Sequence, residues 1–149
     1  MGICLRRRGR YPKLAEGVCK GGYVLADAEP GQPELILVAT GSEVHLALAA
    51  REKLAKQGAQ VRVVRMPSIE VFTRQPQTYR GEVLPGGVPR LVIEAGRTLG
   101  WRSYFEATDA FVGVDRFGAS APGETVMREY GFTVENVCQH AERLLKSRD

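Results

Sequence analysis

The chain has 149 residues and a mass of 16.4 kDa, a length that suits one domain with its own hydrophobic core. Hydrophobic residues make up 44% and charged residues 26% of the sequence, which is ordinary for a globular protein and argues against wholesale disorder. No apolar run reaches the roughly 20 residues that a membrane-spanning helix needs, so we expect no membrane partner.

The net charge of +4 is concentrated at the N-terminus. Five basic side chains and no acid precede Leu14, which leaves the rest of the chain close to neutral. A basic tail can bind nucleic acid or an anionic membrane, but no aromatic residue interleaves with Arg6–Arg10 to stack on bases. We therefore expect a solvated arm and no nucleic-acid partner.

The cysteines indicate a reducing compartment. Cys4, Cys19 and Cys138 lack the spacing of a zinc site, and their odd number excludes a complete disulfide framework. No apolar stretch of a secretory signal follows the basic start. Free thiols without an export signal predict a cytoplasmic protein.

Residues 1–22 are predicted to form an N-terminal arm or linker, because glycine and proline punctuate them. A short strand is expected at Tyr23–Leu25. Leu35–Ala39 is a continuous apolar run, typical of a strand that is covered on both faces. An amphipathic helix follows and ends at Gly58, which supplies a left-handed stop. Val61–Arg65 is the next strand and completes a right-handed βαβ unit.

The second half of the chain continues the alternation. The expected elements are short helices over Ile69–Arg74 (capped by Ser68) and Pro76–Val83, strands over Arg90–Glu94 and Phe111–Val114, a helix that starts at Gly118–Pro122, and a last helix capped by Thr133. The aromatic segment Gly100–Ala107 fits neither the helix nor the strand pattern clearly. Alternating strands and helices predict an α/β domain over residues 23–149 with a mostly parallel sheet.

Catalytic motifs are nearly absent. The chain has no Gly-x-Gly-x-x-Gly after a strand, no phosphate-loop Gly-Lys-Ser/Thr and no Gly-x-Ser-x-Gly. Its two histidines, His45 and His140, lie far apart on predicted helices, without a second ligand at metal spacing. We therefore expect no catalytic residue and no metal site in this chain.

The first candidate site follows the buried strand. Thr40, Gly41, Ser42 and Glu43 lie at its carboxyl end, where open α/β sheets place ligands. The free N–H groups and the positive dipole end of the following helix could hold a small anion there. The alternative is capping alone, because Thr40 and Glu43 have capping-box spacing and Ser42 is a second candidate cap.

The second candidate site is a contact surface. Glu94 ends a predicted strand, where a carboxylate can be functional or can accept N–H bonds from a neighbouring loop. Aromatic residues and glycines gather in the loops Gly96–Phe105 and Phe117–Pro122, as they do where a domain meets another domain or subunit. The candidate interface residues are Glu94, Gly96, Trp101, Phe117, Ser120 and Pro122.

Short runs between Lys20 and Leu145 occur in a characteristic order. They are Gly22-Tyr23-Val24-Leu25, ELILVATGSE over 34–43, VVRMPS over 63–68, Val83-Leu84-Pro85, Glu94-Ala95-Gly96, Gly100-Trp101, FGASAP over 117–122 and YGFTVENV over 130–137. Together they resemble the carboxy-terminal domain of transketolase, across nearly the whole chain.

The resemblance implies a three-layer sandwich, in which helices flank a five-stranded mixed sheet that is mostly parallel with one antiparallel strand. Transketolase transfers a two-carbon ketol unit between sugar phosphates of the pentose phosphate pathway, with thiamine diphosphate and a divalent metal (Mg or Ca). In that family the cofactor and substrate sites belong to other domains, and no Gly-Asp-Gly metal motif occurs here. The resemblance therefore implies no catalytic or cofactor-binding residue in this chain.

The function that follows from the resemblance is subunit packing and assembly. The implied partners are the remaining transketolase domains and the second subunit of a homodimer, and we expect no turnover by the isolated chain. The alternative is a stand-alone regulatory module that binds a small anion or nucleotide at Thr40–Glu43.

Overall fold

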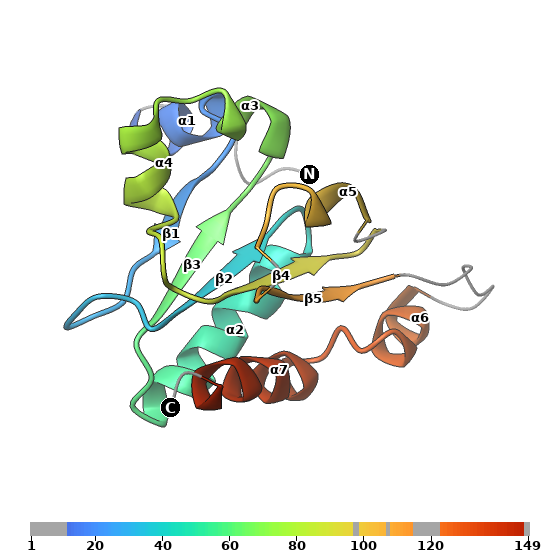
Figure 1. Cartoon of the computed structure of the whole chain (residues 1–149). Helices are drawn as coiled ribbons and strands as arrows, with labels where there is room; N and C mark the ends of the chain where they lie inside the picture. The colour runs from blue at the N-terminus through green and yellow to red at the C-terminus, as the bar shows by residue number, and fades with distance from the viewer. Residues whose placement is uncertain (1–11, 97–98, 107, 115–122, 148–149) are drawn as a thin grey trace.

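A five-stranded sheet runs through the centre of the molecule, with helices on both faces (Figure 1). The structure is a computed structural model and describes residues 12–96, 99–106, 108–114 and 123–147. In chain order the elements are α1 (Pro12–Cys19), β1 (Tyr23–Ala26), β2 (Leu35–Ala39), α2 (Glu43–Lys56), β3 (Val61–Arg65), α3 (Ile69–Thr73), α4 (Gln77–Val83), β4 (Arg90–Glu94), α5 (Leu99–Arg102), β5 (Ala110–Gly113), α6 (Gly123–Glu129) and α7 (Val134–Lys146).

The strand order is β1-β3-β2-β4-β5. β2 pairs in parallel with both β3 and β4, and β4 pairs in parallel with β5, whereas β1 pairs antiparallel with β3. The predicted fold class, a mostly parallel mixed sheet with one antiparallel strand, is therefore confirmed.

The central strand β2 supplies side chains to two separate hydrophobic cores. Leu35, Leu37 and Ala39 pack with α2 and α7, whereas Ile36 and Val38 pack with α3, the end of α4 and neighbouring side chains. Figure 1 shows α2 and α7 on one side of the sheet and α3 and α4 on the other. All five residues of β2 are buried because both of its faces are covered, as the uninterrupted apolar run predicts.

Three local signals act as the sequence predicts. The Ser68 hydroxyl accepts a hydrogen bond from the Val71 N–H at 3.3 Å, and the Thr133 hydroxyl accepts one from the Asn136 N–H at 3.2 Å. Gly58, just beyond the end of α2, has φ +91°, a left-handed conformation that glycine adopts without steric cost. The segment with no clear pattern contains the four-residue helix α5.

The prediction of an arm over residues 1–22 differs from the structure, because helix α1 lies within that range and packs beside β1. Gly21 and Gly22 are buried. A Cβ atom on Gly21, which has φ +82°, would lie 2.4 Å from the Ser68 carbonyl oxygen. The glycines taken as linker punctuation therefore permit close packing of backbone against α3, and residues 1–11 lie outside the described part of the chain.

A charged pair holds the loop after β1 against β3. Arg62 is 8% exposed and donates from Nε to Asp27 Oδ1 at 2.7 Å. It also donates to the carbonyl oxygens of Glu82 and Val83 at 2.7 and 3.2 Å. Burial raises the pKa of Asp27, but the hydrogen bonds from Arg62 and from the Ala28 N–H outweigh it and leave that pKa below its usual value.

Candidate functional site

Thr40 and Glu94 meet at the carboxyl edge of the sheet. The register pairs Ala39 of β2 with Ile93 of β4, so the residues that follow lie side by side. Thr40 Oγ1 donates a hydrogen bond to Glu94 Oε2 at 2.5 Å. The loop after Glu94 contains residues outside the described range, so a role for this carboxylate as an acceptor of loop N–H groups stays a prediction.

The predicted capping box at Thr40 and Glu43 is wrong. Helix α2 begins at Glu43, and its N-cap is Ser42, which makes no side-chain capping bond. Instead the Ser42 hydroxyl donates to Glu43 Oε1 at 2.7 Å. Thr40 precedes the N-cap position, and its hydroxyl is used by Glu94, so the reciprocal pattern of a capping box cannot form.

The four candidate anion-binding residues lie together, but their charge is negative. Glu43 is only 5% exposed, and its carboxylate lies over Gly41, where an added Cβ would be 3.5 Å from Oε2. This carboxylate already complements the positive end of the α2 dipole, and a bound anion would be repelled by it. The geometry therefore argues against an anion between Thr40 and Glu43, and that site stays a prediction.

A cavity of about 400 Å³ opens beside this corner. It is lined by Ser42, Glu43 and Leu46 from the start of α2, together with Gly123, Met127 and Phe132. Half of these residues carry apolar side chains, and the one titratable group is Glu43, which is hydrogen-bonded. A hollow of this kind suits contact with another apolar surface better than acid–base chemistry.

The predicted contact surface contains a row of aromatic rings. Trp101 of α5 stacks with Phe105 at 6.0 Å between ring centroids, and Phe105 meets the edge of Phe111 at 6.1 Å. Leu99, which the sequence analysis missed, is 74% exposed beside them, and Tyr104 is 42% exposed. The signal that could have found Leu99 is its position in the loop Gly96–Phe105, directly before Gly100 and outside every predicted strand and helix.

The other candidate interface residues divide into two groups. Glu94 is held by Thr40, and Gly96 lies close to it, since an added Cβ there would be 3.2 Å from Glu94 Oε1. Phe117, Ser120 and Pro122 lie outside the described residues.

The titratable groups that the structure describes do not meet the requirements of a metal centre. Within residues 12–96, 99–106, 108–114 and 123–147, no three His, Cys, Asp or Glu side chains are grouped so that they could hold a metal ion. His45 is exposed, and burial together with the nearby Arg143 lowers the pKa of His140, which favours its neutral form. In the same described ranges, no helix has the length and apolar character to cross a bilayer.

The sequence matches the model of the transketolase-like TK C-terminal domain over residues 21–133. The chain belongs to this family. Over 131 residues, which are 87% of the chain, this transketolase C-terminal domain is 54% identical to the transketolase of Geobacillus stearothermophilus. It is 47% identical over 142 residues, or 95% of the chain, to transketolase 1 of Escherichia coli strain K12.

Solved structures support the same assignment. The transketolase from Leishmania mexicana superposes on 89% of the domain with a TM-score of 0.81 and 43% sequence identity, over 19% of its own chain. The domain covers 20% and 21% of the two bacterial relatives. It therefore spans about one fifth of the length of the transketolases that it matches.

Proposed function

We propose that this domain packs and assembles a transketolase, and that catalysis is carried by other parts of the enzyme. Two findings support the proposal. The chain matches the model of the transketolase C-terminal domain, and it covers only about one fifth of the length of each transketolase relative. Several carboxylates of the described residues are engaged with neighbouring side chains, Glu94 with Thr40 and Asp27 with Arg62, which suits structural support.

The whole enzyme would perform thiamine-diphosphate-dependent transfer of a two-carbon ketol unit between sugar phosphates, in the cytoplasm and as a homodimer. Thiamine diphosphate and the divalent metal would be held by the remaining domains. The cofactor supplies the carbanion chemistry when bound, and this domain would keep those domains in their relative positions.

The contact surface would include Glu94, Gly96, Leu99 and Trp101. Phe117, Ser120 and Pro122, which lie outside the described residues, are proposed as part of the same interface from the sequence alone. Leu99 supports this placement, because a leucine that is 74% exposed on a short helix gains from burial against a partner. Trp101 lies on the same short helix as Leu99 and packs against the hydrophobic core, which ties that helix to the domain.

A chimaera tests the proposal directly. The matching fifth of the Geobacillus stearothermophilus transketolase is replaced by residues 20–149 of this chain, and dimerisation and ketol transfer are measured. We expect an active dimer. In the chimaera, Leu99→Glu should weaken dimerisation or domain packing more than Val71→Glu does. Val71 is the matched control because it is another exposed aliphatic side chain within residues 20–149, with 36% of its surface exposed.

The isolated chain provides the second arm of this test. Calorimetry with thiamine diphosphate and Mg²⁺ should show no binding, and an assay with a ketose phosphate donor should show no transfer. Tight cofactor binding or turnover by the isolated chain would contradict the proposal.

A further inference from the structure

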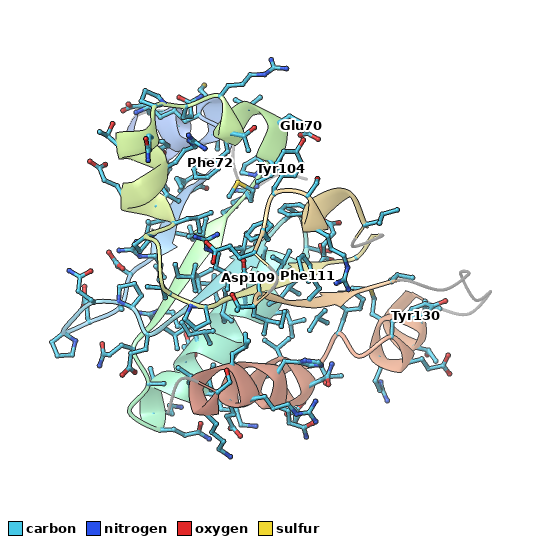
Figure 2. The ribbon with its side chains drawn as sticks, viewed as in Figure 1. Glu70, Phe72, Tyr104, Asp109, Phe111 and Tyr130 are labelled. Carbon is cyan, nitrogen blue, oxygen red and sulfur yellow. The ribbon has the colours of Figure 1, made fainter. Side chains whose placement is uncertain are left out.

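A second cavity, of about 290 Å³, lies on the opposite face of the sheet from α2 and α7. Its walls come from α3, α4, the start of β4 and the residue Tyr104 after α5. Figure 2 labels Phe72 and Tyr104, which line it from two segments far apart in the sequence. The cavity is distinct from the corner occupied by Thr40 and Glu94.

Two arginines line this cavity, Arg80 on α4 and Arg90 at the start of β4. The Nε atom of each is buried, and neither has a hydrogen-bond partner within the described residues. A buried N–H on a charged group is costly when no acceptor is present, so two such groups in one cavity point to an acceptor that binds there.

The nearest carboxylate does not satisfy Arg90. Asp109 Oδ2 lies 3.8 Å from Arg90 Nη1, which is too far for a hydrogen bond. The Asp109 oxygens are already used, since Oδ1 accepts from the Arg90 backbone N–H at 3.0 Å and Oδ2 from the Glu106 N–H at 2.9 Å. The Arg90 side chain, which is 12% exposed, therefore keeps donors available toward the cavity.

The rest of the lining is neutral. Gln77 and Tyr104 contribute an amide and a phenol, Phe72 and Leu84 contribute apolar surface, and no acidic residue is among the described residues that form the walls. The described walls therefore carry two guanidinium groups and no carboxylate, and Asp109, with Oδ2 at 3.8 Å from Arg90 Nη1, offsets only part of their positive charge. Guanidinium groups bind phosphate and carboxylate oxygens through paired N–H donors.

We propose that this cavity binds a phosphate group of a small molecule between Arg80 and Arg90. The volume exceeds that of the phosphate group itself, so part of a phosphomonoester can enter with it, against Phe72 and Tyr104. This gives the domain a ligand site in addition to its proposed packing role.

The test is a titration of the full 149-residue chain with inorganic phosphate and with glycerol 3-phosphate at low ionic strength, followed by calorimetry and by the thermal midpoint. Both ligands should bind and raise the midpoint, because a ligand that binds only the folded state stabilises it. Arg80→Gln should weaken phosphate binding by about tenfold or more, since it removes charged hydrogen bonds.

The matched control is Arg74→Gln, which makes the same charge change at an exposed position next to the cavity and outside its walls. It should change the affinity by less than the Arg80 substitution does. Arg90→Lys is the second variant, because it keeps the charge opposite Asp109 but removes the paired donors, and it should also weaken binding while the apo protein remains folded.

Three outcomes of these titrations overturn the proposal, and a fourth comes from a variant at Gly41. One is the absence of saturable binding of either phosphate ligand, and another is an equal loss of affinity in the Arg74 and Arg80 variants. The third is acetate binding as tight as phosphate, which would assign the cavity to a protein carboxylate. Gly41→Val should leave phosphate binding unchanged, and loss of binding there would move the site to Thr40–Glu43 instead.

Discussion

The hydroxyl of Thr40 and the carboxylate of Glu94 join the ends of two adjacent strands through a hydrogen bond of 2.5 Å. The first prediction follows from it. Thr40→Val should lower the free energy of unfolding by about 1–2 kcal/mol, because Glu94 loses a donor at a half-buried position. Thr40→Ser keeps the hydroxyl and should cost less. Urea unfolding of the two variants gives the comparison, and equal losses would show that this hydrogen bond contributes nothing to stability.

Gly21 and Gly58 allow backbone strain and steric clash to be separated. Both have positive φ, +82° at Gly21 and +91° at Gly58. An added Cβ at Gly21 would clash with the Ser68 backbone, whereas an added Cβ at Gly58 would have no atom within 4 Å. Gly58→Ala should cost about 1–2 kcal/mol from the left-handed conformation. Gly21→Ala should cost a further 1–3 kcal/mol, about the usual penalty of overpacking, as measured by denaturant unfolding.

This pair of glycine variants also tests where the folded domain begins. If Gly21→Ala is no worse than Gly58→Ala, the segment before β1 does not pack on α3 in solution, and the arm predicted from the sequence would be the better description.

The ion pair between Asp27 and Arg62 predicts a pH dependence of stability. The pKa of Asp27 is lowered in the folded state from its usual 3.8, so its contribution is present above that value and is lost as the pH falls through the lower folded pKa. Asp27→Asn should lower the free energy of unfolding at pH 7 by about 1–3 kcal/mol, because the buried Arg62 loses its counter-charge.

The difference in the free energy of unfolding between Asp27→Asn and the parent should shrink as the pH drops below 3.8. The control is Glu29→Gln, a charge change at an exposed neighbouring position. Its free energy of unfolding should stay close to that of the parent at every pH. Chemical unfolding between pH 7 and pH 2.5, a range set by the usual carboxyl pKa values, measures both variants. A difference that grows at low pH would contradict the assigned direction.

The cysteines should differ in reactivity. Cys138 is 3% exposed and its Sγ lies 3.8 Å from the Ala50 carbonyl oxygen, whereas Cys19 is exposed. Burial raises the pKa of the Cys138 thiol, which leaves less of the reactive thiolate. In a Cys4→Ser background, a thiol reagent should label one site quickly, and Cys19→Ser should remove that fast phase. Rapid labelling of Cys138 in the folded protein would show that α7 opens readily.

Local patterns predicted the fold well. The apolar run Leu35–Ala39 is β2 to the residue, and Ser68 and Thr133 cap the helices that follow them. Each of these features is decided by neighbours in sequence, through periodicity or the chemistry of one cap. The resemblance to transketolase rests on the same short runs, and the family assignment confirms it.

The candidate site was less predictable, because contacts between distant residues decide it. The Thr40 hydroxyl donates a hydrogen bond to a carboxylate 54 residues away, so it does not form the cap that the local spacing predicted. Arg80 and Arg90 carry no motif, and only the fold brings their side chains to one cavity. Gly21 looked like a linker residue because sequence alone does not show what packs against a missing Cβ.

Because neighbouring side chains of β2 enter opposite cores, the two layers share a single backbone. If the side chains of one core lose their packing, β2 moves and the other core loses its packing as well. Neither core can therefore unfold in a separate transition. Heat or denaturant should therefore dismantle the whole sandwich in one cooperative step, and probes placed on α3 and on α7 should report the same midpoint.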